Sequence, residues 1–182
     1  MLNMRKKGIF INCLLYGVFV FYIALLILIL FRTRHLERSI NFIPLRGIIS
    51  FLSGNDLVSN KDGAIVLRAF AISNLVGNIV IFVPLGVYIT LFRKNKGIWK
   101  NTLLIMLVST LVEIIQVIFK FGIGDIDDII LNTIGGFFGI LIYRLVLLMC
   151  KDDLKARRMI AFLAPIAGIA SFVILFLYNN KY

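Results

Sequence analysis

The sequence predicts an all-α integral membrane protein, a bundle of about five transmembrane helices, and three observations support this fold class. Of its 182 residues, 60% are hydrophobic, and the mean hydropathy of +0.98 is well above that of a soluble domain. Long apolar segments recur along the chain, each close to the ~20 residues of helix that cross a hydrocarbon core. The lysines and arginines lie mostly in short clusters between these segments. We therefore expect a single membrane domain over residues 1–182, located in the cell membrane and crossing it several times.

The apolar segments that we expect to span the membrane are residues 9–31, 69–92, 102–119, 129–150 and 159–178. The first follows a basic cluster, as in a signal peptide, but its apolar run is far longer than the ~7–15 residues of a signal core. No small-residue cleavage site follows it. We expect the first segment to remain in the protein as a membrane anchor.

The distribution of basic residues predicts the orientation. Eleven lysines and arginines lie before the first segment, between the second and third segments, and between the fourth and fifth. These three stretches are on one side of the membrane. The stretches on the other side are much longer in total and contain only eight. Cytoplasmic loops carry the excess of these residues. The N-terminus is therefore predicted to lie inside. The net charge of +11 is explained by this pattern, so we predict no nucleic-acid partner.

One segment, residues 38–52, is too short to cross the membrane but has apolar residues near helical spacing: Phe42, Leu45, Ile49 and Leu52. Pro44 suits the first turn of a helix. We expect a short amphipathic element along the outer interface.

The three central segments carry polar and small residues that a lipid-facing helix would not tolerate. In the second segment these are Asn74, Gly77, Asn78, Pro84 and Gly86. The third has Glu113 and Gln116 in its outer half, and the fourth begins with Asp125, Asp127 and Asp128, followed one turn deeper by Asn132. Asp128, Asn132, Gly135, Gly136 and Gly139 then form a seam suited to close helix packing. The topology predicts that these polar residues converge in one leaflet.

The aspartates have both a structural and a functional interpretation. Asp125 precedes an apolar helix as an N-cap would, and Asp127 and Asp128 in the first turn would favour the helix dipole. Capping needs only one acid, however, and three acids within four residues repel one another. Asp127 or Asp128 could instead bind a cation, accept hydrogen bonds from a cationic or hydroxyl-rich head group, or donate a proton.

Glu113 is the more telling acid, because a carboxyl group inside a transmembrane helix costs at least ~2.5 kcal/mol and calls for a partner. We consider Asn78, Asn132 and Arg38 as partners. Glu113, Asp127 and Asp128 are the candidates for acid–base catalysis, although no nucleophile motif accompanies them, and whether the protein is an enzyme stays open. No cofactor or metal site is predicted, while a divalent cation is compatible with several carboxylates.

Three stretches taken together resemble the VanZ-like family of bacterial membrane proteins. They are Arg38 to Pro44, then Asn74 to Asn78 with Phe82 to Gly86, and then Glu113 to Gln116 leading to Asp125 to Gly135. The resemblance covers about 38–143. It implies ligand-binding roles for Asn74, Asn78, Glu113, Gln116, Asp125, Asp127, Asp128 and Asn132, and structural roles for Gly77, Pro84, Gly86 and Gly135.

The resemblance implies resistance to glycopeptide antibiotics, particularly lipid-tailed ones such as teicoplanin, in a Gram-positive cell. Our hypothesis is an outward-facing polar pocket that engages an amphiphile among the membrane lipids, either the antibiotic or a cell-wall or lipid precursor. One alternative is a membrane-embedded enzyme acting on a lipid-linked head group. A second is a structural or assembly subunit. The sequence makes no prediction of the oligomeric state.

Overall fold

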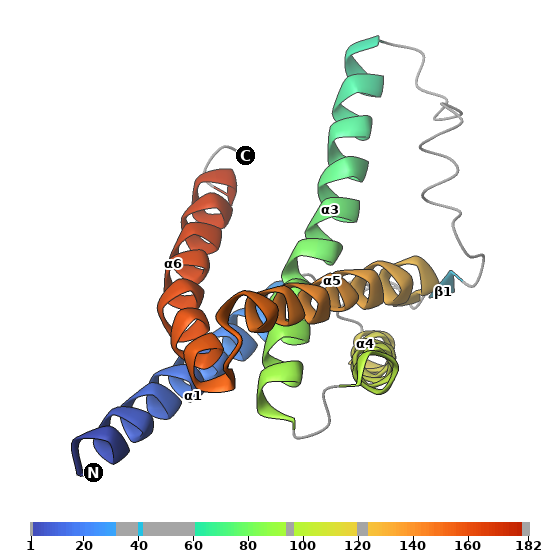
Figure 1. The fold of residues 1–182 in the computed structure, drawn as a ribbon. Helices are drawn as coiled ribbons and strands as arrows, with labels where there is room; N and C mark the ends of the chain where they lie inside the picture. Colours follow the sequence, from blue (N-terminus) through green and yellow to red (C-terminus); the bar gives the residue numbers. More distant parts are fainter. Residues whose placement is uncertain (1, 32–39, 42–60, 94–96, 120–123, 180–182) are drawn as a thin grey trace. The chain divides into compact units, whose positions relative to one another are not determined.

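A computed structural model describes residues 2–31, 40–41, 61–93, 97–119 and 124–179 (Figure 1). Nearly all of these residues are helical, which confirms the all-α fold class. The helices are α1 (Leu2–Leu30), α3 (Lys61–Phe92), α4 (Ile98–Phe119), α5 (Ile126–Cys150) and α6 (Asp153–Asn179). Two strands of two residues each, β1 (Ile40–Asn41) and β2 (Gly124–Asp125), complete the described part.

Four stretches of helix in the described part are long and apolar enough to cross a membrane: Gly8–Leu30, Leu75–Phe92, Ile98–Phe119 and Ile126–Cys150. They correspond to the first four predicted segments, and the protein is a multi-pass membrane protein. The helix α6 contains the fifth predicted segment, and its crossing of the membrane stays a prediction, as does the inward orientation of the N-terminus.

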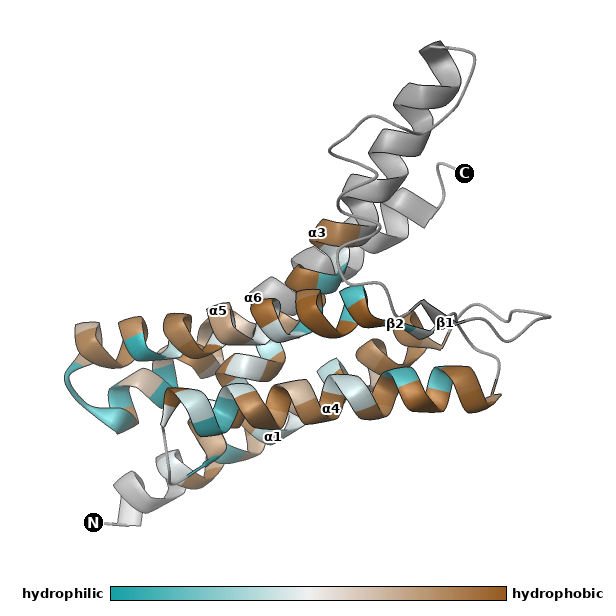
Figure 2. Ribbon diagram, turned by 90° about the vertical axis from the view of Figure 1, so that its right-hand side faces the viewer, coloured by the Kyte–Doolittle hydropathy of each residue, from teal (hydrophilic) through white to brown (hydrophobic). Residues whose placement is uncertain are grey.

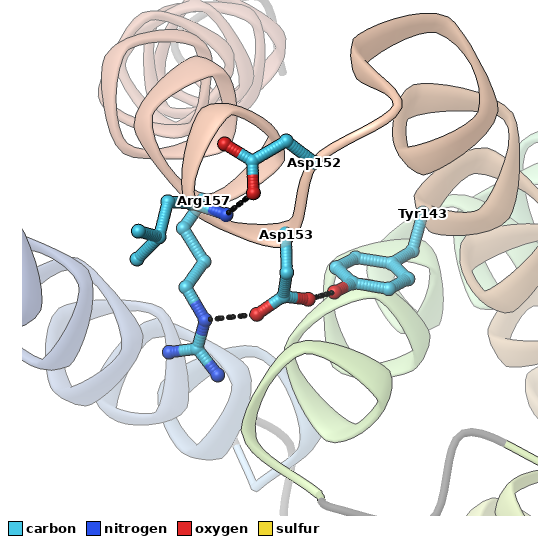
Figure 3. A network of polar contacts seen from close by, with 5 residues as sticks. Tyr143, Asp152, Asp153 and Arg157 are labelled. Carbon is cyan, nitrogen blue, oxygen red and sulfur yellow. Dashed lines mark hydrogen bonds and ion pairs between the residues drawn. The ribbon is translucent and has the colours of Figure 1, made fainter.

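The chain divides into two compact units. The first comprises Met1–Ile27 and Tyr143–Tyr182. In it, Lys151, with a φ of 52°, forms the turn after α5, and Asp152 caps α6 by accepting the N–H of Leu154 at 3.2 Å. Asp153 accepts the Tyr143 hydroxyl at 2.8 Å and Arg157 Nε at 2.9 Å (Figure 3). These polar contacts fix the connection between α5 and α6.

The second unit, Leu28–Ile142, contains the predicted site residues. In it, β1 pairs in parallel with β2, Ile40 opposite Gly124 and Asn41 opposite Asp125. This pairing was not expected, because two residues are too few to give a strand its alternating pattern. The predicted interfacial element at 42–52 lies outside the described residues.

The helices α3 and α5 touch backbone to backbone, and Figure 1 shows them crossing. At three glycines, an added Cβ atom would lie 2.0 Å from a backbone carbonyl oxygen of the other helix. A Cβ atom at Gly86 would meet the oxygen of Gly136, one at Gly135 the oxygen of Ile79, and one at Gly139 the oxygen of Val83. Only glycine allows this approach. The seam predicted from the sequence therefore packs α5 against α3.

The third helix of the unit, α4, packs through side chains. Ile105 is fully buried, and its side chain would lie 2.5 Å from a Cβ atom at Gly136. Gly77 differs from Gly86 of the same helix, since a Cβ atom added at Gly77 would meet none of the described residues within 4 Å. Pro84 lies inside α3, where it removes the N–H that would reach the carbonyl of Val80.

Candidate functional site

The polar residues gather where β2 leads into α5, and Figure 2 shows hydrophilic residues interrupting apolar α4 and α5 near this end. Asp125 precedes the helix, and its Oδ1 accepts the backbone N–H of Asp127 at 3.0 Å. This is the geometry of an N-cap, as the sequence predicted. Asp127 and Asp128 lie in the first turn, where a negative charge is favourable to the helix dipole.

Glu113 of α4 is buried, and its Oε2 accepts the backbone N–H of Asp125 at 3.0 Å. In a capping box the N–H of the cap residue is satisfied by the third residue of the helix, which here is Asp128. Glu113 takes that role from a neighbouring helix instead. It thereby joins α4 to the start of α5.

Because Glu113 accepts the N–H of Asp125, the carboxylate of Asp128 can bind a third helix, α3. Its Oδ1 accepts a hydrogen bond from Nδ2 of Asn78 on α3. The second, third and fourth predicted segments thus bring polar residues together at one level, as expected. The partners differ from those predicted for Glu113, because Asn78 binds Asp128 and Glu113 binds a backbone N–H, while Arg38 lies outside the described residues.

One turn further into the bundle, Asn132 of α5 donates from Nδ2 to Oγ of Ser109 on α4 at 2.9 Å. Asn132 is 2% exposed and Ser109 is fully buried. The Oδ1 atom of Asn132 has no hydrogen-bond partner among the described residues. Asn132 therefore binds Ser109 rather than Glu113.

Sequence reasoning missed Ser109, although a signal for it exists. Every fourth residue of α4 is buried in one row that reads Asn101, Ile105, Ser109 and Glu113. A spacing of four keeps residues close to one face of a helix. Extending the row back from Glu113 would have found both polar positions.

The same row ends in a second polar contact, at the other end of α4. Asn101 is fully buried and donates from Nδ2 to Oγ1 of Thr90 at 3.3 Å. Thr90 in turn donates to the carbonyl of Gly86 at 2.9 Å. Ile105 lies between Asn101 and Ser109 in the row, so an apolar turn separates this contact from the carboxylates.

The remaining predicted residues have other surroundings. Gln116 donates from Nε2 to the carbonyl of Leu30 at 2.7 Å and so binds the end of α1. Asp127 is buried. Asn74 lies within α3, but its side chain is outside the described part of the structure.

Within the described residues, no three His, Cys, Asp or Glu side chains are grouped so that they could hold a metal ion. The neutral donors that contact Glu113 and Asp128, a backbone N–H and an amide, occupy one oxygen of each carboxylate. A carboxylate accepts several hydrogen bonds. The site is therefore rich in acceptors, and a divalent cation stays a prediction from the carboxylates alone.

The N-cap gives a direct prediction for stability. Replacing Asp125 with alanine should lower the free energy of unfolding by about 1 kcal/mol relative to Asp125→Asn, because asparagine keeps a side-chain oxygen for the N–H of Asp127. Both variants remove the charge, so their difference isolates the cap. Thermal unfolding of the purified protein in detergent measures it, and equal stability of the two variants would contradict this role.

A model of the VanZ/LLP1 family matches residues 13–148, about three quarters of the chain. The chain belongs to the VanZ/LLP1 family. The matched region begins within α1. It therefore extends further toward the N-terminus than residues 38–143, over which the resemblance was found in the sequence.

The chain is also similar to Protein VanZ of Enterococcus faecium, with 34% identity over 106 residues. The matched part is 58% of this chain and 63% of Protein VanZ, so the chain spans less than two thirds of that relative. No solved structure matches the chain. The VanZ/LLP1 match includes α3, α4 and the carboxylates at the start of α5.

Proposed function

We propose that this VanZ/LLP1 protein lowers the susceptibility of a Gram-positive cell to glycopeptide antibiotics, in particular lipid-tailed ones such as teicoplanin. It does so by engaging an amphiphile at the outer leaflet through a polar pocket. The observation that carries the proposal is the junction of three membrane helices at one acidic level, made by the contacts of Asn78 with Asp128 and of Glu113 with Asp125.

The physical argument starts from the cost of polar groups inside a membrane. Intramembrane carboxyl groups are expensive and mark functional sites by default. Here one acid of α4, two acids of α5 and Asp125 of β2 lie near the ends of these spans, where the head group of an amphiphile also lies. Their oxygens suit its cationic or hydroxyl groups.

An exposed apolar surface of α4 would contact the hydrocarbon tail of the amphiphile. Ile114 and Ile118 follow Glu113 on α4, and their side chains are exposed in the described structure. A tail would lie along such a surface, as lipid tails do. Phe42, Ile49 and Leu52 of the predicted interfacial element, which would extend this surface, lie outside the described residues.

The test is the teicoplanin susceptibility of a sensitive Gram-positive host that expresses the chain, beside hosts expressing Glu113→Gln and Asp128→Asn at equal membrane abundance. We expect the parent to raise the inhibitory concentration and both variants to lose most of the increase, because each removes a carboxylate from the site. Thr110→Ala is the matched control on α4, since the hydroxyl of Thr110 donates to the carbonyl of Met106 on its own helix and contacts no carboxylate among the described residues.

Two outcomes would overturn the proposal. If the parent gives no protection at full membrane abundance, the chain has no role in resistance. If it protects and the carboxylate variants protect equally, the acidic site is not the working site. In that case the polar contacts serve helix packing, as in a structural or assembly subunit. Cation-dependent turnover of a lipid-linked head group by the purified protein would instead establish the enzyme alternative.

A further inference from the structure

The amide of Asn132 is the observation from which the inference starts. It is 2% exposed, it donates to Ser109, and its Oδ1 has no partner in the described structure. Exchanging the amide oxygen and nitrogen would not remove the problem, because Ser109 offers one contact for two amide atoms. Buried polar atoms are nearly always satisfied, so an unsatisfied one indicates a missing partner.

The position of this atom relates it to the carboxylates. Asn132 follows Asp128 by one helical turn on α5, and Ser109 precedes Glu113 by one turn on α4. The contact between Asn132 and Ser109 therefore forms the layer directly beneath Glu113 and Asp128. An unpartnered acceptor lies under acids that are themselves acceptors.

The two acids also lack a cationic partner in the described part of the chain. Glu113 and Asp128 receive hydrogen bonds from a backbone N–H and an amide, both neutral. In the described part of the chain, neither acid forms an ion pair with a lysine or arginine. A complementary group must bring a positive charge and several N–H donors at once.

A primary ammonium group meets both requirements, because it carries one positive charge and three donors on a single atom. A quaternary ammonium group supplies the charge without donors, and a hydroxyl group supplies one donor without the charge. We infer that the site takes a primary ammonium group on an amphiphile, with Asn132 Oδ1 as an acceptor at the floor and the carboxylates of Glu113 and Asp128 above it.

This inference rests on the proposed function, since it names the chemical class that the acidic site engages. It makes Asn132 a specificity-determining residue. The carboxylates attract any cation by their charge, whereas Asn132, which is neutral, stabilises only a cation that donates a hydrogen bond to its oxygen.

The experiment measures equilibrium binding of three probes with the same twelve-carbon tail. The protein is reconstituted in nanodiscs of neutral phosphatidylcholine, and binding to empty nanodiscs is subtracted. The probes are dodecylammonium, dodecyltrimethylammonium and dodecanol. We expect dodecylammonium to bind about tenfold more tightly than dodecyltrimethylammonium, the scale of one hydrogen bond to a charged group. Dodecanol should bind most weakly.

The variant Asn132→Ala should show a smaller preference for dodecylammonium than the parent, because it removes one acceptor and leaves those of the carboxylates. Asn132→Leu is a second variant that fills the same space, and it covers the case in which the alanine variant does not fold. Asn101→Ala is the matched control. Asn101 is an equally buried amide on the α4 row whose Oδ1 also has no partner among the described residues, but it lies at the opposite end of α4. This control should keep the tenfold preference.

Equal binding of the two cations to the parent would overturn the inference, and so would a preference that both Asn132 variants leave undiminished. Neither result changes the outcome of the resistance measurement, because that measurement uses the antibiotic in cells and not the probes in nanodiscs. Conversely, absence of teicoplanin protection together with Asn132-dependent ammonium binding would reject the proposed function and leave the ammonium site in place.

Discussion

Replacing Gly139 with leucine is expected to prevent α5 from packing on α3. A Cβ atom at this position would lie 2.0 Å from the carbonyl oxygen of Val83, and that oxygen belongs to a helix backbone that cannot rotate away. Overpacking commonly costs about 1–3 kcal/mol when side chains can adjust, and here the loss should exceed that range. Unfolding of the purified protein in mixed micelles, followed by circular dichroism, measures it.

The control for this substitution is Gly77→Leu in α3. A Cβ atom there meets no described residue within 4 Å, so leucine should be tolerated. It should even gain up to about 1 kcal/mol, because glycine is a poor helix former. Equal losses for the two variants would mean that the close approach of α3 and α5 does not determine stability.

Removing Asn78 should have the second largest effect. Asn78→Leu leaves Asp128 without its only described hydrogen-bond partner beside a membrane span, and the expected loss is about 1.5–3 kcal/mol, the range for hydrogen bonds to charged groups. A double-mutant cycle with Asp128→Leu separates the contact from its surroundings. The double variant should lose at least about 1 kcal/mol less than the two single losses combined.

A second cycle tests whether this coupling is specific. Asn78→Leu combined with Asn101→Leu should be additive within about 0.5 kcal/mol, since these asparagines bind different partners at opposite ends of the unit. Additivity in the first cycle would contradict the contact between α3 and α5 at Asp128.

The sequence predicted the helices well, because apolar runs of membrane length can be recognised without any knowledge of their partners. Asp125 was also predictable as an N-cap, since capping depends only on neighbouring residues. The glycine seam at 135–139 could be read for a similar reason: small residues at helical spacing have few other uses in a membrane.

The partners of the polar residues could not be predicted. Which atom satisfies Glu113 depends on the rotation of α4 against α5, and a one-residue change in that rotation would select a different donor. The pairing of Ile40–Asn41 with Gly124–Asp125 joins segments more than eighty residues apart and has no local signal. Ser109 escaped notice because a single serine in an apolar helix is common.

The backbone contact between α3 and α5 has a consequence for motion. Helices that touch through their carbonyl groups have no layer of side chains that can change rotamer and let one helix slide past the other. These two helices therefore move together as one piece. Under the proposed function, an amphiphile would then enter by displacement of α4, whose contacts at Ile105, Ser109 and Glu113 are made by side chains.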